Sequence, residues 1–240
     1  MVRWLSPYVL GPALAAARFY QAQTEIKRVR NVDDALEYKH LQNLKAFENR
    51  EEMIKSFPKD AVVAEIGVAS GDFASIILRE AMPKKLYLID IWRKGANASG
   101  LGAKIAPKAR KKSGKIDAFD VVLTKFAEEI ESGRVEICHG SSLLMLDQLP
   151  DKSLDWVYLD ARHDFRSVRA DLEAILPKLR IDGIIAGHDY IRWGRFGYRG
   201  GVVEAVHEFC KIHNFELAAL SFDSHYPPSY AIRSVIKRRN

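Results

Sequence analysis

After Pro58 the chain changes from a helical pattern to a regular alternation of short apolar runs and longer amphipathic segments. Five of these runs have the length and composition of strands: residues 62–66, 86–89, 135–138, 154–159 and 184–186. Strands that alternate with helices form right-handed crossover units, in which the strands run parallel. The alternation therefore predicts a doubly wound α/β domain with a mostly parallel sheet.

Two further apolar runs, residues 215–222 and 230–235, follow an amphipathic helix expected over residues 202–213. The segment that joins the two runs is short and contains two consecutive prolines. A connection of this length cannot form a parallel crossover, so the last two strands should pair as an antiparallel hairpin. We therefore expect a seven-stranded sheet, with five parallel strands followed by a C-terminal antiparallel hairpin.

The segment before this pattern, residues 1–58, is predicted to be an N-terminal helical extension of an α/β domain that spans residues 59–240. The spacing of its apolar residues predicts one helix over residues 13–30 and a second over residues 33–56. The apolar stretch at residues 4–17 is too short to span a bilayer. We expect no stable membrane insertion, and peripheral contact through this helix at most.

The composition excludes disordered and membrane-spanning classes, with 48% apolar and 28% charged residues. The net charge of +6 comes from residues 93–116, which contain eight Lys or Arg and no Asp or Glu, so that subtracting these eight leaves −2. We therefore expect no nucleic-acid partner, and interpret the basic segment as a solvated loop that closes over a ligand. Two cysteines without metal-ligand spacing favour a reducing, cytoplasmic location.

Polar or small residues follow every expected parallel strand, at the sheet edge where open α/β sheets bind ligands. The first strand leads through Glu65 into a turn bounded by Gly67 and Gly71, where glycine lets a ligand approach the backbone. The second strand delivers Asp90, about twenty residues after the turn, as required of a carboxylate that accepts both hydroxyls of a ribose. Ser141 follows the third strand. The pattern predicts a nucleoside-type site.

The sequence between residues 64 and 190 carries four motifs in one order: Glu65-x-Gly67-x-x-x-Gly71, Asp90, Asp155-x-x-Tyr158-x-Asp160-x-x-His163, and Gly183-x-Ile185-x-Gly187-His188-Asp189-Tyr190. A further motif, Gly201-Val202-Val203-x-Ala205-Val206-x-x-Phe209, follows them. In combination they resemble class I S-adenosylmethionine (SAM)-dependent methyltransferases, of the macrolide-sugar O-methyltransferase and cephalosporin hydroxylase-like family. The resemblance implies the Rossmann-like methyltransferase fold and O-methylation of a sugar or other natural-product hydroxyl.

The same resemblance assigns the cofactor-binding residues. The glycine turn would hold the methionine part of SAM, the acid after the second strand its ribose, and the residues after the third strand its adenine. The residues expected to bind SAM are Glu65, Gly67, Ala69, Ser70, Gly71, Asp90, Ile91, Trp92, Ser141, Ser142 and Asp160.

The acceptor end is expected after the fourth and fifth strands. The pattern is similar to catechol O-methyltransferases, in which acids at the positions of Asp160 and Asp189 bind magnesium, whereas His188 stands where an acid is usual. The expected metal ligands are therefore Asp160, His188 and Asp189. With a histidine in the set, both the presence of a metal and its identity stay open, either Mg²⁺ or a softer ion such as Mn²⁺ or Zn²⁺. His163, with Asp160, is the expected catalytic base, and a purely structural hydrogen bond is the alternative.

Two other functions remain open at this point. A nicotinamide-dependent oxidoreductase would also use a glycine turn and Asp90, although the turn lacks the Gly-x-Gly-x-x-Gly spacing and the chain has no Tyr-x-x-x-Lys dyad. A non-catalytic SAM-binding module would keep the sheet without the reaction. The sequence does not fix the oligomeric state, and a homo-oligomer is compatible with it.

Overall fold

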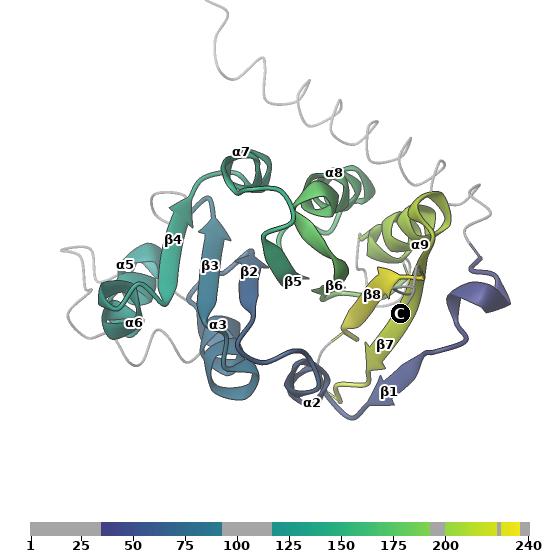
Figure 1. Ribbon diagram of the computed structural model, residues 1–240, viewed down its shortest axis with the longest axis horizontal. Helices are drawn as coiled ribbons and strands as arrows, with labels where there is room; N and C mark the ends of the chain where they lie inside the picture. The colour runs from purple at the N-terminus through teal and green to yellow at the C-terminus, as the bar shows by residue number, and fades with distance from the viewer. Residues whose placement is uncertain (1–34, 93–116, 193–199, 225–226, 236–240) are drawn as a thin grey trace, which may run out of the picture. The chain divides into compact units, whose positions relative to one another are not determined.

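The computed structural model describes residues 35–92, 117–192, 200–224 and 227–235. The compact unit from Leu36 to Asn240 is built around one eight-stranded sheet (Figure 1). The helix expected over residues 13–30 and the basic segment 93–116 lie outside the described residues, so the expected lid is not tested.

The strands and helices alternate through most of the unit. The strands are β1 (Lys45–Phe47), β2 (Val62–Ile66), β3 (Lys85–Asp90), β4 (Val135–His139), β5 (Leu154–Leu159), β6 (Leu179–Gly187), β7 (Phe215–Ser221) and β8 (Tyr230–Ser234). The helices are α2 (Arg50–Lys55), α3 (Asp72–Ile76), α5 (Ala118–Lys125), α6 (Ala127–Glu131), α7 (Ser142–Gln148), α8 (Phe165–Ile175) and α9 (Val202–His213). Shorter turns are η1 (Tyr38–His40), the π-helical η2 (Ile77–Ala81) and η4 (Leu176–Lys178).

The strand order is β1-β7-β8-β6-β5-β2-β3-β4. β8 runs antiparallel to both of its neighbours, and the other paired strands are parallel. This arrangement confirms the predicted parallel sheet with a C-terminal hairpin. The chain order reverses between β2 and β5, and such a switch point at the carboxyl ends of the strands is where open sheets bind ligands.

The sheet is covered on both faces: α7, α8 and α9 lie on one side, and α2 and α3 on the other (Figure 1). Side chains alternate along β3, so that Leu86 and Leu88 enter the core beneath α2 and α3 together with the fully buried Trp156 and Tyr158 of β5. Burial of each such side chain contributes about 1.5–3 kcal/mol to folding. This core fixes the position of the strand ends that carry the polar residues.

The helix predicted over residues 33–56 is wrong, because that segment contains η1, β1 and α2 instead. Asn49 has an extended backbone, and its side chain accepts a hydrogen bond from Glu52 N at 2.8 Å, so a new helix begins at Arg50. Before this cap, β1 pairs with β7, from Lys45 opposite Ala219 onward. β1 is the eighth strand that the prediction of seven missed.

A ring of hydrogen bonds connects α2 to the hairpin and to β5. Arg50 N donates to Asp223 at 3.3 Å, Ser221 Oγ donates to the same carboxylate at 2.6 Å, and Ser229 N donates to Ser221 Oγ at 3.0 Å. The hydroxyl of Tyr158 lies 2.9 Å from Ser229 Oγ and is also hydrogen-bonded by the Arg50 side chain. The segment before β2 therefore supports β5, the strand that ends at the candidate site.

None of the helices in the part of the chain that the structure describes is long and apolar enough to cross a membrane.

Gly67 is expected to be essential for folding, because its φ is +93° and a Cβ there would lie 2.1 Å from the backbone oxygen of Asp160. Gly133 has a similar φ of +76° but nothing within 4 Å of a Cβ. Gly133→Ala should therefore cost only the backbone penalty of about 1–2 kcal/mol. Gly67→Ala should cost more than about 4 kcal/mol in urea unfolding, and equal losses for the two variants would contradict the proposed backbone clash.

Candidate functional site

A pocket of about 640 Å³ opens at the switch point, where the carboxyl ends of β2 to β5 meet. The residues that line it come from four strand ends and from one face of α8. They are Ile66, Gly67, Ala69, Ile89, Asp90, Ile91, Gly140, Ser141, Ser142, Leu143, Asp160, Ala161, Arg162, Arg166, Ser167, Ala170 and Asp171. The pocket is large enough for a nucleoside-containing ligand.

The Asp90 carboxylate is held in place by the backbone on both sides. Its Oδ2 accepts a hydrogen bond from Ala69 N at 2.9 Å, and its Oδ1 accepts one from Trp92 N at 2.9 Å. The Trp92 indole N–H donates to Ala69 O at 2.9 Å, which joins the glycine turn to the end of β3. Each carboxylate oxygen keeps a further lone-pair site for a ligand hydroxyl. The acid is therefore preorganised as a double acceptor.

Seven of the eleven residues expected to bind the cofactor line this pocket: Gly67, Ala69, Asp90, Ile91, Ser141, Ser142 and Asp160. The other four are buried and are not among the lining residues: Glu65, Ser70, Gly71 and Trp92. Burial raises the pKa of Glu65 well above its usual range, and its Oε2 has no hydrogen-bond partner among the described residues. Trp92 is therefore buried next to two lining residues, Asp90 and Ala69, to which it is hydrogen-bonded.

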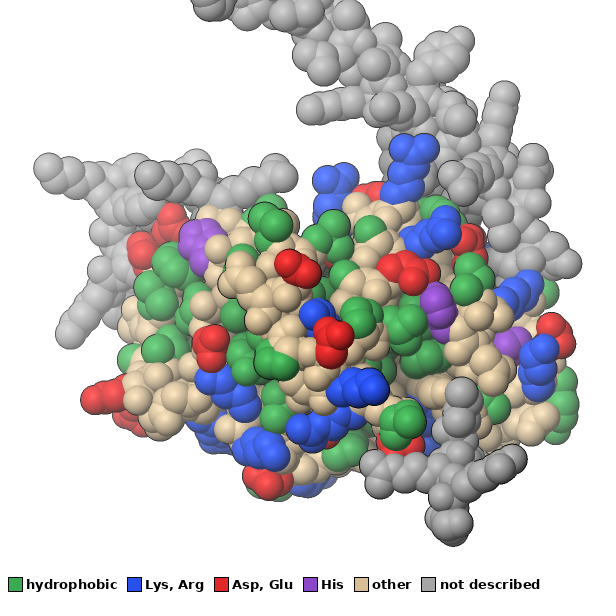
Figure 2. Space-filling view, turned by 45° about the horizontal axis from the view of Figure 1, so that its top comes forward, with side chains coloured by type: hydrophobic (Ala, Val, Ile, Leu, Met, Phe, Trp, Pro, Cys, Tyr) green, Lys and Arg blue, Asp and Glu red, His purple; other side chains and the backbone are tan. Residues whose placement is uncertain are grey.

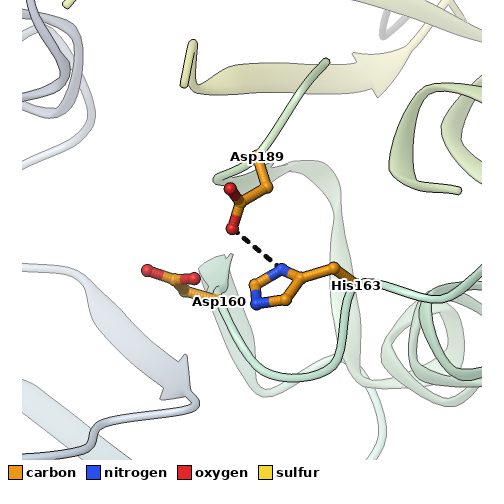
Figure 3. Close-up of side chains that lie close together, drawn as sticks. All are labelled: Asp160, His163 and Asp189. Atoms are coloured by element: carbon orange, nitrogen blue, oxygen red, sulfur yellow. Dashed lines mark ion pairs between the residues drawn. The ribbon is translucent and has the colours of Figure 1, made fainter. Parts of the chain in front are cut away.

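The second part of the site lies beside this pocket, after β5 and β6 (Figure 3). Asp160 follows β5, His163 lies in the loop before α8, and Asp189 follows β6. The His163 Nδ1 is 2.8 Å from Asp189 Oδ2, while its other ring nitrogen points away from that carboxylate (Figure 3). The His163 loop is also fixed by a 2.7 Å hydrogen bond from Gly201 N to His163 O.

The charges of this group depend on one another. The hydrogen bond that His163 donates to Asp189 raises the pKa of His163. Burial alone would raise the pKa of Asp189, but hydrogen bonds from His163 and His188 outweigh it and lower that pKa. Burial raises the pKa of Asp160, and His188 opposes this effect. Asp189 is therefore the anionic partner, and His163 is a stronger base than a histidine in water.

The metal set expected from the sequence differs from the group that the geometry brings together. Asp160, His163 and Asp189 each offer a ligand atom, and these atoms lie within 4.8 Å of one another. His188 is not one of the three, although its Nδ1 lies 3.3 Å from Asp189 Oδ2 and 3.9 Å from Asp160 Oδ1. His188 is thus a buried neighbour of both carboxylates, and its Nε2 has no partner among the described residues.

The sequence prediction missed the contribution of α8, which lines the pocket with Arg166, Ser167, Ala170 and Asp171. One signal was available. One face of α8 carries Val168, Asp171, Leu172 and Ile175 at helical spacing. The three apolar residues of this face belong to the buried core, and Asp171 is the acid among them. An acid at an otherwise apolar position indicates a polar partner or a ligand.

Comparisons with known proteins agree with this architecture. Residues 64–190, just over half of the chain, match the model of a methyltransferase domain family. A curated relative, protein y4gI of Sinorhizobium fredii, is 25% identical over 122 residues, which are 51% of this chain and 11% of that protein. The chain thus spans only a small part of this relative.

Several solved structures have the same fold. A SAM-dependent methyltransferase from Aquifex aeolicus has a TM-score of 0.53 and 12% identity, over 87% of this chain and 98% of that chain. An rRNA methylase from Streptococcus thermophilus has a TM-score of 0.53 and 12% identity, over 78% of this chain and 94% of that chain. SMU.1697c from Streptococcus mutans was solved with S-adenosylhomocysteine (SAH). It has a TM-score of 0.51 and 13% identity, over 78% of this chain and 96% of that chain.

At these identities the solved structures show the fold alone, whereas the family model covers the residues that build the site. The chain belongs to the methyltransferase domain family and has the fold of class I SAM-dependent methyltransferases.

Proposed function

We propose that this protein transfers the methyl group of SAM to a hydroxyl oxygen of a small molecule, such as a sugar or another natural product. The observation that carries the proposal is the position of Asp160. It lines the nucleoside-sized pocket and also lies within 4.8 Å of the histidine and carboxylate ligand atoms of the second cluster. A cofactor in the pocket would thus have its reactive end beside a proton acceptor.

At the cofactor end, Asp90 would accept the two ribose hydroxyls, because its oxygens are already oriented by Ala69 and Trp92. The turn at Gly67 would hold the methionine part, and the residues after β4 would meet the adenine. When bound, SAM supplies an electrophilic methyl group on a positively charged sulfur. The protein has to add position and proton removal.

At the acceptor end, His163 is arranged as the base. The Nδ1–H donates to Asp189, and the second ring nitrogen, Nε2, would accept the proton of an acceptor hydroxyl as the oxygen attacks the methyl group. Asp189 stabilises the imidazolium that forms, as an anionic partner of a catalytic histidine does. Asp160 lies next to this pair and would orient the acceptor hydroxyl.

A divalent ion is a second way to lower the pKa of the acceptor hydroxyl. Asp160, His163 and Asp189 offer oxygen and nitrogen ligands that suit a borderline ion. The 2.8 Å hydrogen bond between His163 and Asp189 favours the base instead, because it already orients the histidine for proton transfer.

A small acceptor fits the charge distribution better than a nucleic acid does. Outside residues 93–116 the chain has a slight excess of negative charge. On the face turned forward in Figure 2, acidic side chains are scattered among apolar ones, and several basic side chains gather in its lower part. Binding of polynucleotides depends on clustered positive charge and weakens steeply with salt.

Asp90→Ala should weaken the binding of SAH, which we expect to have a micromolar dissociation constant. The loss of a charged acceptor for two hydroxyls corresponds to roughly 1.5–3 kcal/mol, or a factor of about ten to a hundred. Isothermal calorimetry measures the change, and Asp147→Ala, an exposed acid in α7, is the matched control. Tight NADH binding with no response to SAH would refute the proposal.

His163→Ala should lower kcat by about a hundredfold or more while SAH affinity stays unchanged. SAH formation with a panel of sugar and natural-product hydroxyl compounds is the assay, and His213→Ala, paired with Glu173 at 3.0 Å on the surface of α9, is the control. EDTA should leave the activity intact. Loss of activity with EDTA would assign deprotonation of the acceptor to a metal. Activity that survives both EDTA and the His163→Ala substitution would show that this cluster has no part in catalysis.

A further inference from the structure

Asp171 is an acid that the methyl-transfer reaction does not use, yet it faces the cofactor pocket. It lies in the middle of α8, is only 5% exposed, and lines the same pocket as Asp90. Its hydrogen bond comes from Ser142 Oγ, at 2.5 Å. The pair therefore joins α8 to the first turn of α7 at the pocket wall.

A buried carboxylate with one hydroxyl donor is not fully satisfied. Carboxylate oxygens together have about four lone-pair sites, and Ser142 fills one of them. Burial without further donors is costly, so a ligand that brings an N–H or O–H group to this wall is favoured. A ligand that presents a carbonyl oxygen there would be repelled by the carboxylate.

The place of this pair relative to Asp90 indicates which part of a nucleoside reaches it. Gly140 N donates to Asp90 O at 2.9 Å, so the loop after β4 lies directly beside the acid that would hold the ribose. Ser142, two residues after Gly140, is the first residue of α7. Ile91 and Leu143 also line the pocket and are 45% and 47% exposed, which gives apolar surface for the faces of a base.

We propose that Asp171, oriented by Ser142, accepts a hydrogen bond from the exocyclic amino group of the cofactor's adenine and thereby selects an adenosyl over an inosyl cofactor. The inference rests on the proposed use of SAM. Asp171 is then a specificity-determining residue on α8, distant along the chain from the glycine turn and from Asp90. Sites built to bind an N–H group discriminate strongly against analogues that lack it.

The test compares two ligands that differ at one edge of the base: SAH, and S-inosylhomocysteine, in which a carbonyl oxygen replaces the amino group and N1 carries a proton. Calorimetry on the full chain should show that the wild-type protein binds the inosyl compound at least about tenfold more weakly. Asp171→Asn should reduce this preference to less than about threefold, because the amide can also donate to the oxygen. Ser142→Ala is the second variant, and Asp147→Asn in α7 is the control that should keep the wild-type ratio.

The outcomes separate this inference from the proposed function. If the wild-type protein binds SAH and the inosyl compound equally, the role of Asp171 is refuted while the use of SAM stands. A wild-type preference that persists in both Asp171→Asn and Ser142→Ala likewise refutes it. If neither compound binds the wild-type protein, the proposed function fails together with the inference.

Discussion

The close approach of β2 and β5 is the constraint on which the site depends. Their ends can meet because residue 67 is a glycine: a Cβ atom at this position would lie 2.1 Å from the carbonyl oxygen of Asp160. Two hydrogen bonds fix this junction: Asp160 N donates to Ile66 O at 2.8 Å, and Gly67 N donates to Ile89 O at 2.9 Å. The ends of β2, β3 and β5 are thereby locked together, and Asp90 and Asp160 face one pocket.

From this junction the two halves of the chemistry follow. On one side, backbone donors of Ala69 and Trp92 orient Asp90, which is the proposed acceptor for the ribose hydroxyls. On the other side, β6 lies next to β5, so Asp189 comes within 2.8 Å of His163. Preorganised groups of this kind lower the barrier because they need little rearrangement during the reaction. The sheet thus places a proton acceptor where the methyl group is expected.

Much of the fold could be predicted from the sequence, because buried parallel strands are short apolar runs and the short Pro-Pro connection excludes a crossover. The helix Val202–His213 was predicted with its exact bounds. Residues 33–56 were not, because apolar spacing alone concealed the Asn49 cap and the edge pairing of β1 with β7. The sequence also named Asp90, Asp160, His163 and Asp189. It marked Asp171 only as an acid on an apolar helix face, and the position of α8 against the pocket shows what this acid faces.

The central claim is that one pocket holds SAM with its sulfur directed toward the Asp160, His163 and Asp189 cluster. A crystal structure of the protein with SAH measures this directly. The account predicts the ribose hydroxyls on the Asp90 carboxylate and the sulfur beside Asp160, on the side of His163 Nε2. A nucleoside bound away from Asp90, or a sulfur that faces away from Asp160 and His163, would contradict it.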